Sequence, residues 1–385
     1  MRICVLLALA MMSTMPGLAA DPTPEEVRAA TIRQLPALHL RQPPWASPTV
    51  YRESTVLLQE KDGAPLVGRL AFPTEEILAV KSADGTQTFT VGKDCELGLE
   101  KRTLIFPATA PVKFIKQSEL FVPTGSPDSY KHRVGHPEQS LMYHTGSWFH
   151  DRQIEVTYRR SNAVWSGPKP ALAEKVLPRT FARLKAGQPL TLGVSGDSIS
   201  AGGDASGMWK FAPHMPAFPE LAAAQLQQAY RSPITLKNRA VGGWSIANGN
   251  ADLDKLLEEK PHLIIVAYGM NDVGRRNPGW FREQNKSLLD RIQAAAPETE
   301  IILVAPMLGN AEWVHTPREM FAAYRDVLQE LTGPGIALAD LTAVWTELLQ
   351  HKHDLDLIGN GLNHPNDCGH RLYAQTILGL LVTPE

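Results

Sequence analysis

A serine in a glycine-rich turn is the first candidate for chemistry in this sequence. Residues 191–200 begin as a run of strand-forming residues and end in Gly196, Asp197 and Ser198. A strand that ends at small residues presents a serine at its carboxyl end, where the backbone N–H groups of the turn are free to meet an anion. This pattern is typical of a nucleophilic serine held in a turn after a strand. The structural alternative is a turn in which Asp197 or Ser198 caps the next helix.

Three more polar segments follow predicted strands or precede the last predicted helix: Asn238–Gly243, Gly269–Asp272 and Asn363–Asn366. In a doubly wound sheet the carboxyl ends of the strands converge on one edge, so we expect all four segments to meet there. A serine hydroxyl needs a base, and histidine is suited to that role near neutral pH. A tetrahedral oxyanion needs donors already in place. The four segments together therefore predict acyl transfer.

The ordered segments resemble the sequence blocks of the SGNH, or GDSL-type, hydrolases, which are esterases and lipases with a flavodoxin-like fold. The resemblance covers residues 190–382. It implies that Ser198 is the nucleophile and His364 the base, and that the Ser198 N–H, the Gly243 N–H and the Asn271 amide form the oxyanion hole. The glycine doublet leaves Gly242 as an alternative to Gly243. Each segment alone also fits a turn or a cap, and the ordered set carries the resemblance.

One position departs from the family pattern. In the family an aspartate usually stands three residues before the catalytic histidine, and here that position is Gly361, beside Asn360. We therefore predict a Ser–His dyad, with Asp356 as the alternative third member of a triad. Asp367 fits a helix N-cap better. A dyad still works, because any good acceptor can fix the tautomer and angle of the imidazole.

The elements that must position these residues follow a regular alternation. Apolar strand patterns over Leu190–Val194, Ile234–Asn238, His262–Tyr268, Glu300–Ala305 and Ile336–Ala339 alternate with helical patterns. We expect the helices at Phe218–Tyr230, Ala251–Lys260, Trp280–Ala296, Pro317–Leu331, Thr342–His351 and Cys368–Leu381. This alternation predicts a three-layer α/β sandwich around a parallel sheet.

The first half of the chain has a different pattern. Residues 51–166 contain short strand patterns separated by turn signals, which predict a small all-β, sandwich-like domain. A lead-in over residues 21–50, with a short helix at Glu25–Leu35, precedes it, and a linker over residues 167–188 joins it to the hydrolase domain at 189–385. His132, His136, His144 and His150 lie in a loop-rich stretch without fixed spacing. We expect them to line an interdomain cleft with neighbouring aromatic residues rather than to bind a metal.

Size and composition narrow the class of protein. A chain of 385 residues indicates about two domains, and a net charge of −2 gives no electrostatic case for binding nucleic acid. Residues 1–20 have a basic start, a short apolar run and small residues at the end, which predict a cleaved signal peptide, so the protein is expected to be secreted or periplasmic. The apolar run is too short to span a bilayer. Cys95 and Cys368 form either a disulfide or two buried thiols.

We therefore expect an exported serine esterase that hydrolyses short acyl esters, acetyl esters first, of a carbohydrate or small molecule. The resemblance to carbohydrate esterases suggests this substrate. No cofactor is expected, and the oligomeric state stays open. Trp209, Trp244 and Trp313 are candidates for binding the substrate. The alternatives are a lipase or thioesterase of the same superfamily, or a non-catalytic glycan-binding protein on a decayed hydrolase fold.

Overall fold

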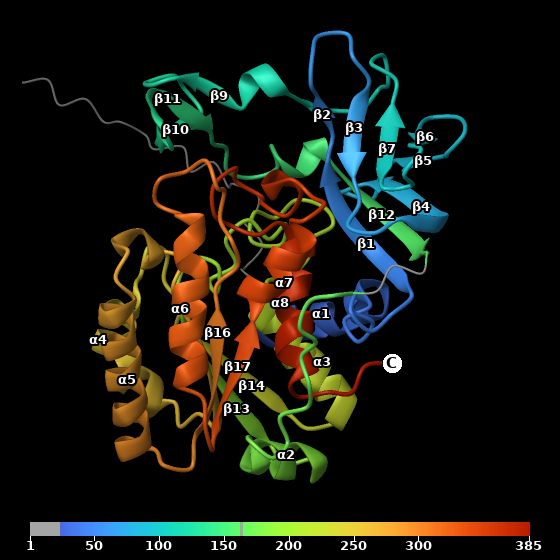
Figure 1. The fold of residues 1–385 in the computed structure, drawn as a ribbon. Coiled ribbons are helices and arrows are strands. Elements are labelled where there is room, and N and C mark those ends of the chain that lie inside the picture. The colour runs from blue at the N-terminus through green and yellow to red at the C-terminus, as the bar shows by residue number, and fades with distance from the viewer. Residues whose placement is uncertain (1–23, 162–164) are drawn as a thin grey trace, which may run out of the picture.

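A β-rich domain lies over the carboxyl edge of a parallel α/β sheet (Figure 1). The computed structural model describes residues 24–161 and 165–385, so the predicted signal peptide lies outside the described residues. The predicted lead-in helix is α1 (Pro24–Leu38), which packs against α3 (Phe218–Tyr230) of the second domain. None of the helices in these described ranges is long and apolar enough to cross a membrane.

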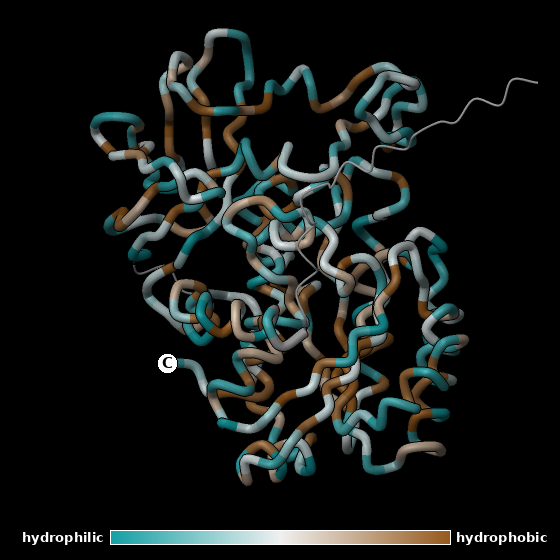
Figure 2. The backbone as a smooth tube through the Cα atoms, turned by 180° about the vertical axis from the view of Figure 1, so that it is seen from behind, coloured by the Kyte–Doolittle hydropathy of each residue, from teal (hydrophilic) through white to brown (hydrophobic). Residues whose placement is uncertain are grey.

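The second domain is built on five parallel strands in the order β14-β13-β15-β16-β17. The strands are β13 (Leu190–Gly196), β14 (Ile234–Asn238), β15 (Leu263–Ala267), β16 (Glu300–Ala305) and β17 (Ile336–Asp340). Every residue of β15 and β16 is buried, because helices cover both faces of the sheet. Figure 2 shows the apolar strands inside and more polar helices outside. The predicted three-layer α/β fold is confirmed.

Helices α4, α5 and α6 cover one face of the sheet, and α3, α7 and α8 lie on the other (Figure 1). Their bounds are α4 (Ile246–Glu258), α5 (Pro278–Ala295), α6 (Arg318–Glu330), α7 (Leu341–Leu348) and α8 (Asp367–Gly379), and α2 (Pro178–Lys185) precedes β13. Helix α4 begins at Ile246 rather than at the predicted Ala251, because Ser245 and Asn248 form a capping box. Position 249 of this helix requires a glycine, because a Cβ there would lie 2.5 Å from the Tyr268 ring.

The β-rich domain contains two main sheets. One has the order β1-β12-β4-β5 and the other the order β6-β7-β3-β2-β8. Their strands are β1 (Thr49–Val56), β2 (Leu58–Gln59), β3 (Leu66–Arg69), β4 (Thr74–Ser82), β5 (Thr88–Phe89), β6 (Glu96–Leu97), β7 (Thr103–Phe106), β8 (Ile115–Lys116) and β12 (Gln153–Arg160). The sheets pack closely, and a Cβ at Gly68 of β3 would lie 2.9 Å from the Thr55 side chain of β1.

A third, three-stranded sheet occupies the stretch predicted to be loop-rich. It consists of β9 (Phe121–Pro123), β10 (Ser129–Arg133) and β11 (His136–Met142), and short 3-10 turns at Gln117–Glu119 and His150–Arg152 flank it. The expectation of loops was wrong here, because short polar strands give little periodic signal and are fixed by their partners. Figure 1 shows this sheet, called the ribbon below, set apart from the other two and above the α4–α6 side of the α/β domain.

The two cysteines that follow the predicted signal peptide are unpaired. Cys95 lies in the β-rich domain and Cys368 in α8, and both thiols are buried and free. Burial raises the pKa of both thiols, to about 11 for Cys95, so they stay protonated near neutral pH. The disulfide alternative is therefore not realised.

Candidate active site

Ser198 stands in the turn just after β13, at the carboxyl edge of the sheet. The strand ends at Gly196, where a Cβ would lie 2.3 Å from the Ser200 hydroxyl and 3.1 Å from the carbonyl oxygen of Ala267. The Val241 N–H donates to the carbonyl of Gly196 at 3.1 Å, which holds the loop after β14 against the same turn. The tight turn therefore needs a glycine, and it delivers the serine hydroxyl to the edge where the other polar segments gather.

His364 connects Ser198 to a buried carboxylate. Its Nε2 lies 2.9 Å from Ser198 Oγ, and its Nδ1 lies 2.7 Å from Oδ2 of Asp204, whose side chain is 2% exposed. With Nδ1 donating to the carboxylate, Nε2 is left as an acceptor for the serine proton. The arrangement has the hydrogen-bond order of a Ser–His–Asp triad, which can activate a serine for attack on a carbonyl.

Glycines make room for this contact. A Cβ on Gly203 would lie 2.8 Å from His364 Nδ1 and 2.9 Å from the carbonyl oxygen of Ser198, and a Cβ on Gly359 would lie 2.7 Å from Asp204 Cβ. Asp204 itself has φ = 61°, a left-handed conformation that aspartate tolerates better than most residues. Buried His370 donates from Nε2 to the Gly203 carbonyl at 3.0 Å. Burial lowers its pKa to about 4, so this imidazole is neutral.

The prediction of a dyad, with Asp356 as the alternative third member, needs correction. Asp356 Oδ1 accepts from Val56 N at 2.8 Å and Thr55 Oγ1 at 3.1 Å, and its Oδ2 accepts from His353 N at 2.7 Å. Its Oδ1 is thus engaged with β1 and its Oδ2 with the turn before it, whereas Asp204 makes the contact with His364. Sequence reasoning missed Asp204 because it sought the carboxylate near the histidine. The available signal was an aspartate directly after the glycine pair that follows Ser198.

The predicted oxyanion donors lie around Ser198. A Cβ on Gly242 would lie 3.8 Å from Ser198 Cβ, so the glycine doublet passes beside the serine. Gly243 has φ = 79°, which favours glycine. The Asn271 Nδ2 donates one hydrogen to the Trp244 carbonyl at 2.9 Å, which fixes the amide beside this loop and leaves its second hydrogen available. The glycine doublet and the Asn271 amide thus lie on neighbouring loops, and their role as an oxyanion hole stays a prediction.

Two more carboxyl groups are buried beneath the site. Burial raises the pKa of Asp197 to about 7 and that of Asp272 to about 6. Asp197 Oδ1 accepts from Ile199 N at 3.0 Å, and Asp272 Oδ1 accepts from Ile246 N at 3.2 Å at the start of α4. They fix the turns that carry Ser198 and Asn271.

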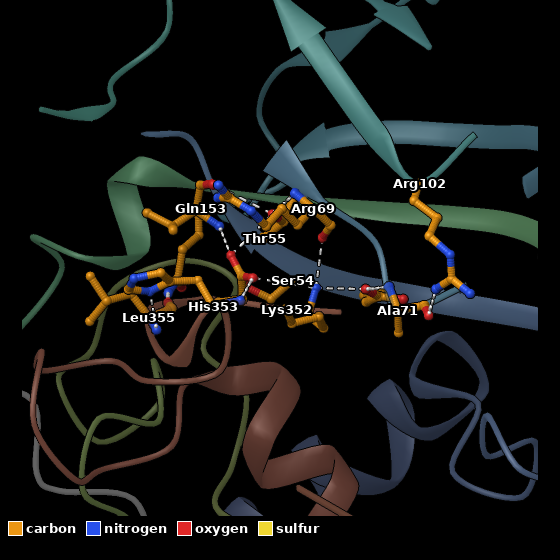
Figure 3. Close-up of polar contacts among 12 residues, drawn as sticks. Ser54, Thr55, Arg69, Ala71, Arg102, Gln153, Lys352, His353 and Leu355 are labelled. Atoms are coloured by element: carbon orange, nitrogen blue, oxygen red, sulfur yellow. Dashed lines mark hydrogen bonds and ion pairs between the residues drawn. The ribbon is translucent and has the colours of Figure 1, made fainter. Parts of the chain in front are cut away.

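The loop that carries His364 rests on the β-rich domain (Figure 3). Gln153 of β12 donates from Nε2 to the carbonyls of Leu355 and Ile358, each at 2.9 Å. Its Oε1 accepts from Asn366 Nδ2 at 3.0 Å, and the same amide reaches Ser54 Oγ of β1 at 3.0 Å. All of these side chains are buried. The histidine loop is thus fixed from both ends by the other domain.

An ion pair completes this anchor. Lys352, whose side chain is fully buried, contacts Glu53 Oε1 of β1 at 2.6 Å. It also donates to the Arg69 carbonyl at 2.8 Å, and Figure 3 shows Lys352 beside Arg69. Burial alone lowers the pKa of Lys352, but the carboxylates of Glu53 and Asp356 outweigh that effect and raise it above its ordinary value. The lysine is therefore charged, and its pairing ties the end of α7 to β1.

The three predicted substrate-binding tryptophans are in different surroundings. Trp209 is 45% exposed in the loop after Ser198, Trp244 is partly buried against the core, and Trp313 packs edge-on against Tyr130. The four histidines do not converge. His132 bonds His315, His144 stacks on Trp148, His136 lies by Glu138 and His150 bonds the Ala212 carbonyl. A cleft of about 810 Å³ lies behind the ribbon, and its lining does not include Ser198 or His364.

Fold and site together define an α/β protein with a hydrogen-bonded Ser–His–Asp array at the carboxyl edge of its sheet. Residues 194–372 match the model of the GDSL-like lipase/acylhydrolase family. The match lies within the α/β domain, which thus contains a GDSL-like lipase/acylhydrolase domain, and it covers less than half of the chain. No curated protein matches the sequence significantly.

Several solved structures are similar in fold at low identity. A two-domain esterase (CEX) active on acetylated mannans is 20% identical, with a TM-score of 0.44, and the match spans 57% of this chain and 55% of that one. The match thus spans about half the length of that esterase. LAE5, an α/β hydrolase enzyme from the metagenome of Lake Arreo, Spain, is 24% identical. That match covers 51% of this chain and 96% of LAE5, with a TM-score of 0.41. Axe2, an acetylxylan esterase from Geobacillus stearothermophilus, is 21% identical. That match covers 50% of this chain and 94% of Axe2, with a TM-score of 0.40.

Proposed function

We propose that the protein is an exported serine esterase that removes acetyl or other short acyl groups from a carbohydrate. The observation that carries the proposal is the continuous hydrogen-bonded array from Ser198 Oγ through His364 to Asp204, with separations of 2.9 and 2.7 Å. A binding protein needs a complementary surface, but it does not need a serine aligned with a base and a buried carboxylate. This array favours the enzyme over the glycan-binding alternative.

In the proposed reaction, Ser198 Oγ attacks the acyl carbon while His364 Nε2 takes the hydroxyl proton. The negative charge on the carbonyl oxygen is stabilised by the N–H groups of Ser198 and Gly243 and by the Asn271 amide. Asp204 holds the imidazole and stabilises its positive charge. The intermediate collapses, the C–O bond to the sugar breaks, and His364 returns the proton to the leaving oxygen. Water then attacks the acyl-enzyme by the same steps, releases the carboxylic acid and restores Ser198.

Hydrolysis of p-nitrophenyl acetate and butyrate by purified residues 21–385 tests the proposal, with Ser198→Ala and His364→Ala as comparisons. We expect activity to fall at least about 1,000-fold in both variants, because each removes a member of one catalytic unit. Acetylated mannan and acetylated xylan form the first glycan panel. Wild-type rates no better than those of the variants on every ester would refute the esterase and favour the glycan-binding protein.

Export is proposed from the sequence of residues 1–20. Expression of the full chain with detection of the mature protein outside the cytoplasm, and mass spectrometry of its N-terminus, tests this part. A mature N-terminus near residue 21 is expected. A product that retains Met1 in the cytoplasm contradicts it.

A further inference from the structure

The ribbon brings a row of aromatic rings to the active-site edge. Tyr130 lies edge-on to Tyr143 at a centroid distance of 5.6 Å and to Trp313 at 5.4 Å, and Trp313 lies 5.0 Å from His315. The row thus joins β10, the segment after β11, and the loop after β16. Tyr130 and His315 are exposed, and Trp313 and Tyr143 are partly exposed. These rings are therefore accessible to a ligand.

The row is built onto the α/β domain by backbone pairing. The N–H of Val134 donates to the Glu312 carbonyl at 2.8 Å, and the N–H of Val314 donates to the His132 carbonyl at 3.1 Å. Arg133 pairs with Glu312 at 2.9 Å, and His132 bonds His315 at 3.0 Å. The loop over residues 312–314 in effect extends the ribbon by one more strand. Such a preorganised surface loses little conformational entropy on binding a ligand.

Both ends of the row contact segments that lead to predicted site residues, His364 at one end and Asn271 at the other. At one end, the N–H of His144 donates to the Asn360 carbonyl at 3.3 Å, and a Cβ on Gly361 would lie 2.5 Å from the Met142 carbonyl oxygen. Burial raises the pKa of Tyr143, and the charge of Asp204 adds to the shift. At the other end, the His315 carbonyl oxygen would lie 3.0 Å from a Cβ on Gly274, in the short turn after Asn271.

Exposed apolar side chains gather around the same edge. Among the described residues, nine large hydrophobic side chains are exposed, and six of them lie on the ribbon, on the loop that pairs with it, or on the loops beside Ser198: Tyr130, Val134, Met208, Trp209, Val241 and Val314. Exposed apolar patches of this kind mark binding surfaces. Of these six side chains, Met208, Trp209 and Val241 lie on the loops beside Ser198, where the substrate must bind.

We propose that Tyr130, Tyr143 and Trp313 form a sugar-binding row that holds the glycan carrying the ester. Pyranose rings present C–H faces that pack on aromatic rings and hydroxyl groups that hydrogen-bond to polar edges. The row offers both, because phenol hydroxyls and an imidazole accompany the rings. The inference rests on the proposed function and adds to it the residues that select a polymeric leaving group.

The test compares kcat/KM for acetylated manno- and xylo-oligosaccharides with kcat/KM for p-nitrophenyl acetate. We expect the ratio of the two to fall about 10-fold in Tyr130→Ala, since one ring contact is lost, and to recover in Tyr130→Phe. Leu99→Ala, which alters a fully exposed apolar side chain in a turn of the β-rich domain, is the matched control and leaves the ratio unchanged. Trp313→Phe is a second variant that keeps a ring in this partly buried position.

The outcomes separate this inference from the esterase proposal. An unchanged ratio in Tyr130→Ala, with Ser198-dependent hydrolysis of p-nitrophenyl acetate intact, overturns the sugar-binding row and leaves the esterase standing. The same holds if the variant loses activity on long-chain p-nitrophenyl esters but not on the oligosaccharides, because the row then binds acyl chains. Absence of Ser198-dependent hydrolysis of any ester overturns both. Calorimetric titration of Ser198→Ala with oligosaccharide, with and without Tyr130→Ala, measures the same contact without turnover, and equal affinities count against it.

Discussion

Replacing Asp204 by asparagine tests the assignment of the third catalytic group most directly. The substitution keeps the shape of the side chain and removes its charge. Asp204 is buried and contacts the histidine rather than the open edge of the site, so substrate binding should change little. The expected signature is therefore a lower kcat at nearly constant KM.

The size of the effect follows from the geometry. A contact of 2.7 Å between Asp204 Oδ2 and His364 Nδ1 puts the charge centres about 4 Å apart once the imidazole is protonated. At an effective dielectric constant of about 20, that attraction is worth about 4 kcal/mol, which corresponds to about a 1,000-fold decrease in kcat. Asparagine can also turn its N–H₂ group toward Nδ1 and stabilise the wrong tautomer, which acts in the same direction.

The assay is steady-state hydrolysis of p-nitrophenyl acetate by Asp204→Asn, with Asp356→Asn as the matched carboxylate control. Asp356→Asn should lower the free energy of unfolding by about 1–3 kcal/mol, because it weakens the buried contacts with Val56 and His353. Its folded fraction should keep kcat within about 10-fold of the wild type. A kcat for Asp204→Asn within threefold of the wild type, or a larger kcat loss in folded Asp356→Asn, would refute the assignment.

Three further predictions concern the surroundings of the triad. Gln153→Leu should cost about 1–3 kcal/mol of stability in urea unfolding and lower kcat more than it changes KM, because two loop carbonyls lose their donor; a kcat unchanged in the folded variant contradicts this. Gly243→Ala should lower the free energy of unfolding by about 1–2 kcal/mol through its positive φ and should reduce activity, whereas Gly242→Ala should have smaller effects on both. The reverse order would assign the oxyanion-hole N–H to Gly242. Because burial raises the pKa of Asp197 to about 7, the folded state binds this proton more tightly than the unfolded chain does, and stability falls as pH rises through that value. The Tm of Asp197→Asn relative to wild type should therefore rise from about pH 5 to about pH 8, and a flat difference contradicts it.

The sequence was informative wherever a local pattern determines the structure. The buried strands β15 and β16 are continuous apolar runs, so their place inside a parallel sheet follows from composition. Once that sheet is known, the carboxyl ends of its strands must meet, and Ser198 and His364 do lie within hydrogen-bond distance although they are far apart in sequence. The parallel direction of the strands and the chemistry of the residues at their carboxyl ends sufficed for this pair.

Asp204 could not be found in this way, because its direction depends on distant atoms. Its left-handed backbone points the carboxylate at His364 only because Gly203 and Gly359 leave room. The ribbon escaped detection for a related reason. Its polar strands are held by pairing with each other and with the loop at Glu312. Their own sequences contain no periodic pattern that would predict strands.

The contacts under the histidine loop also join the β-rich domain to the α/β domain. Gln153, Ser54 and Glu53 supply the partners of buried polar groups on residues 352–366. Buried charges and amides are costly when they lose their partners, so an α/β domain without β1 and β12 would leave Lys352 and Asn366 unsatisfied and the loop free to move. His364 must stay within a few tenths of an ångström of Ser198 to take its proton. We therefore infer that the β-rich domain helps to position the catalytic base and is not merely an appended module.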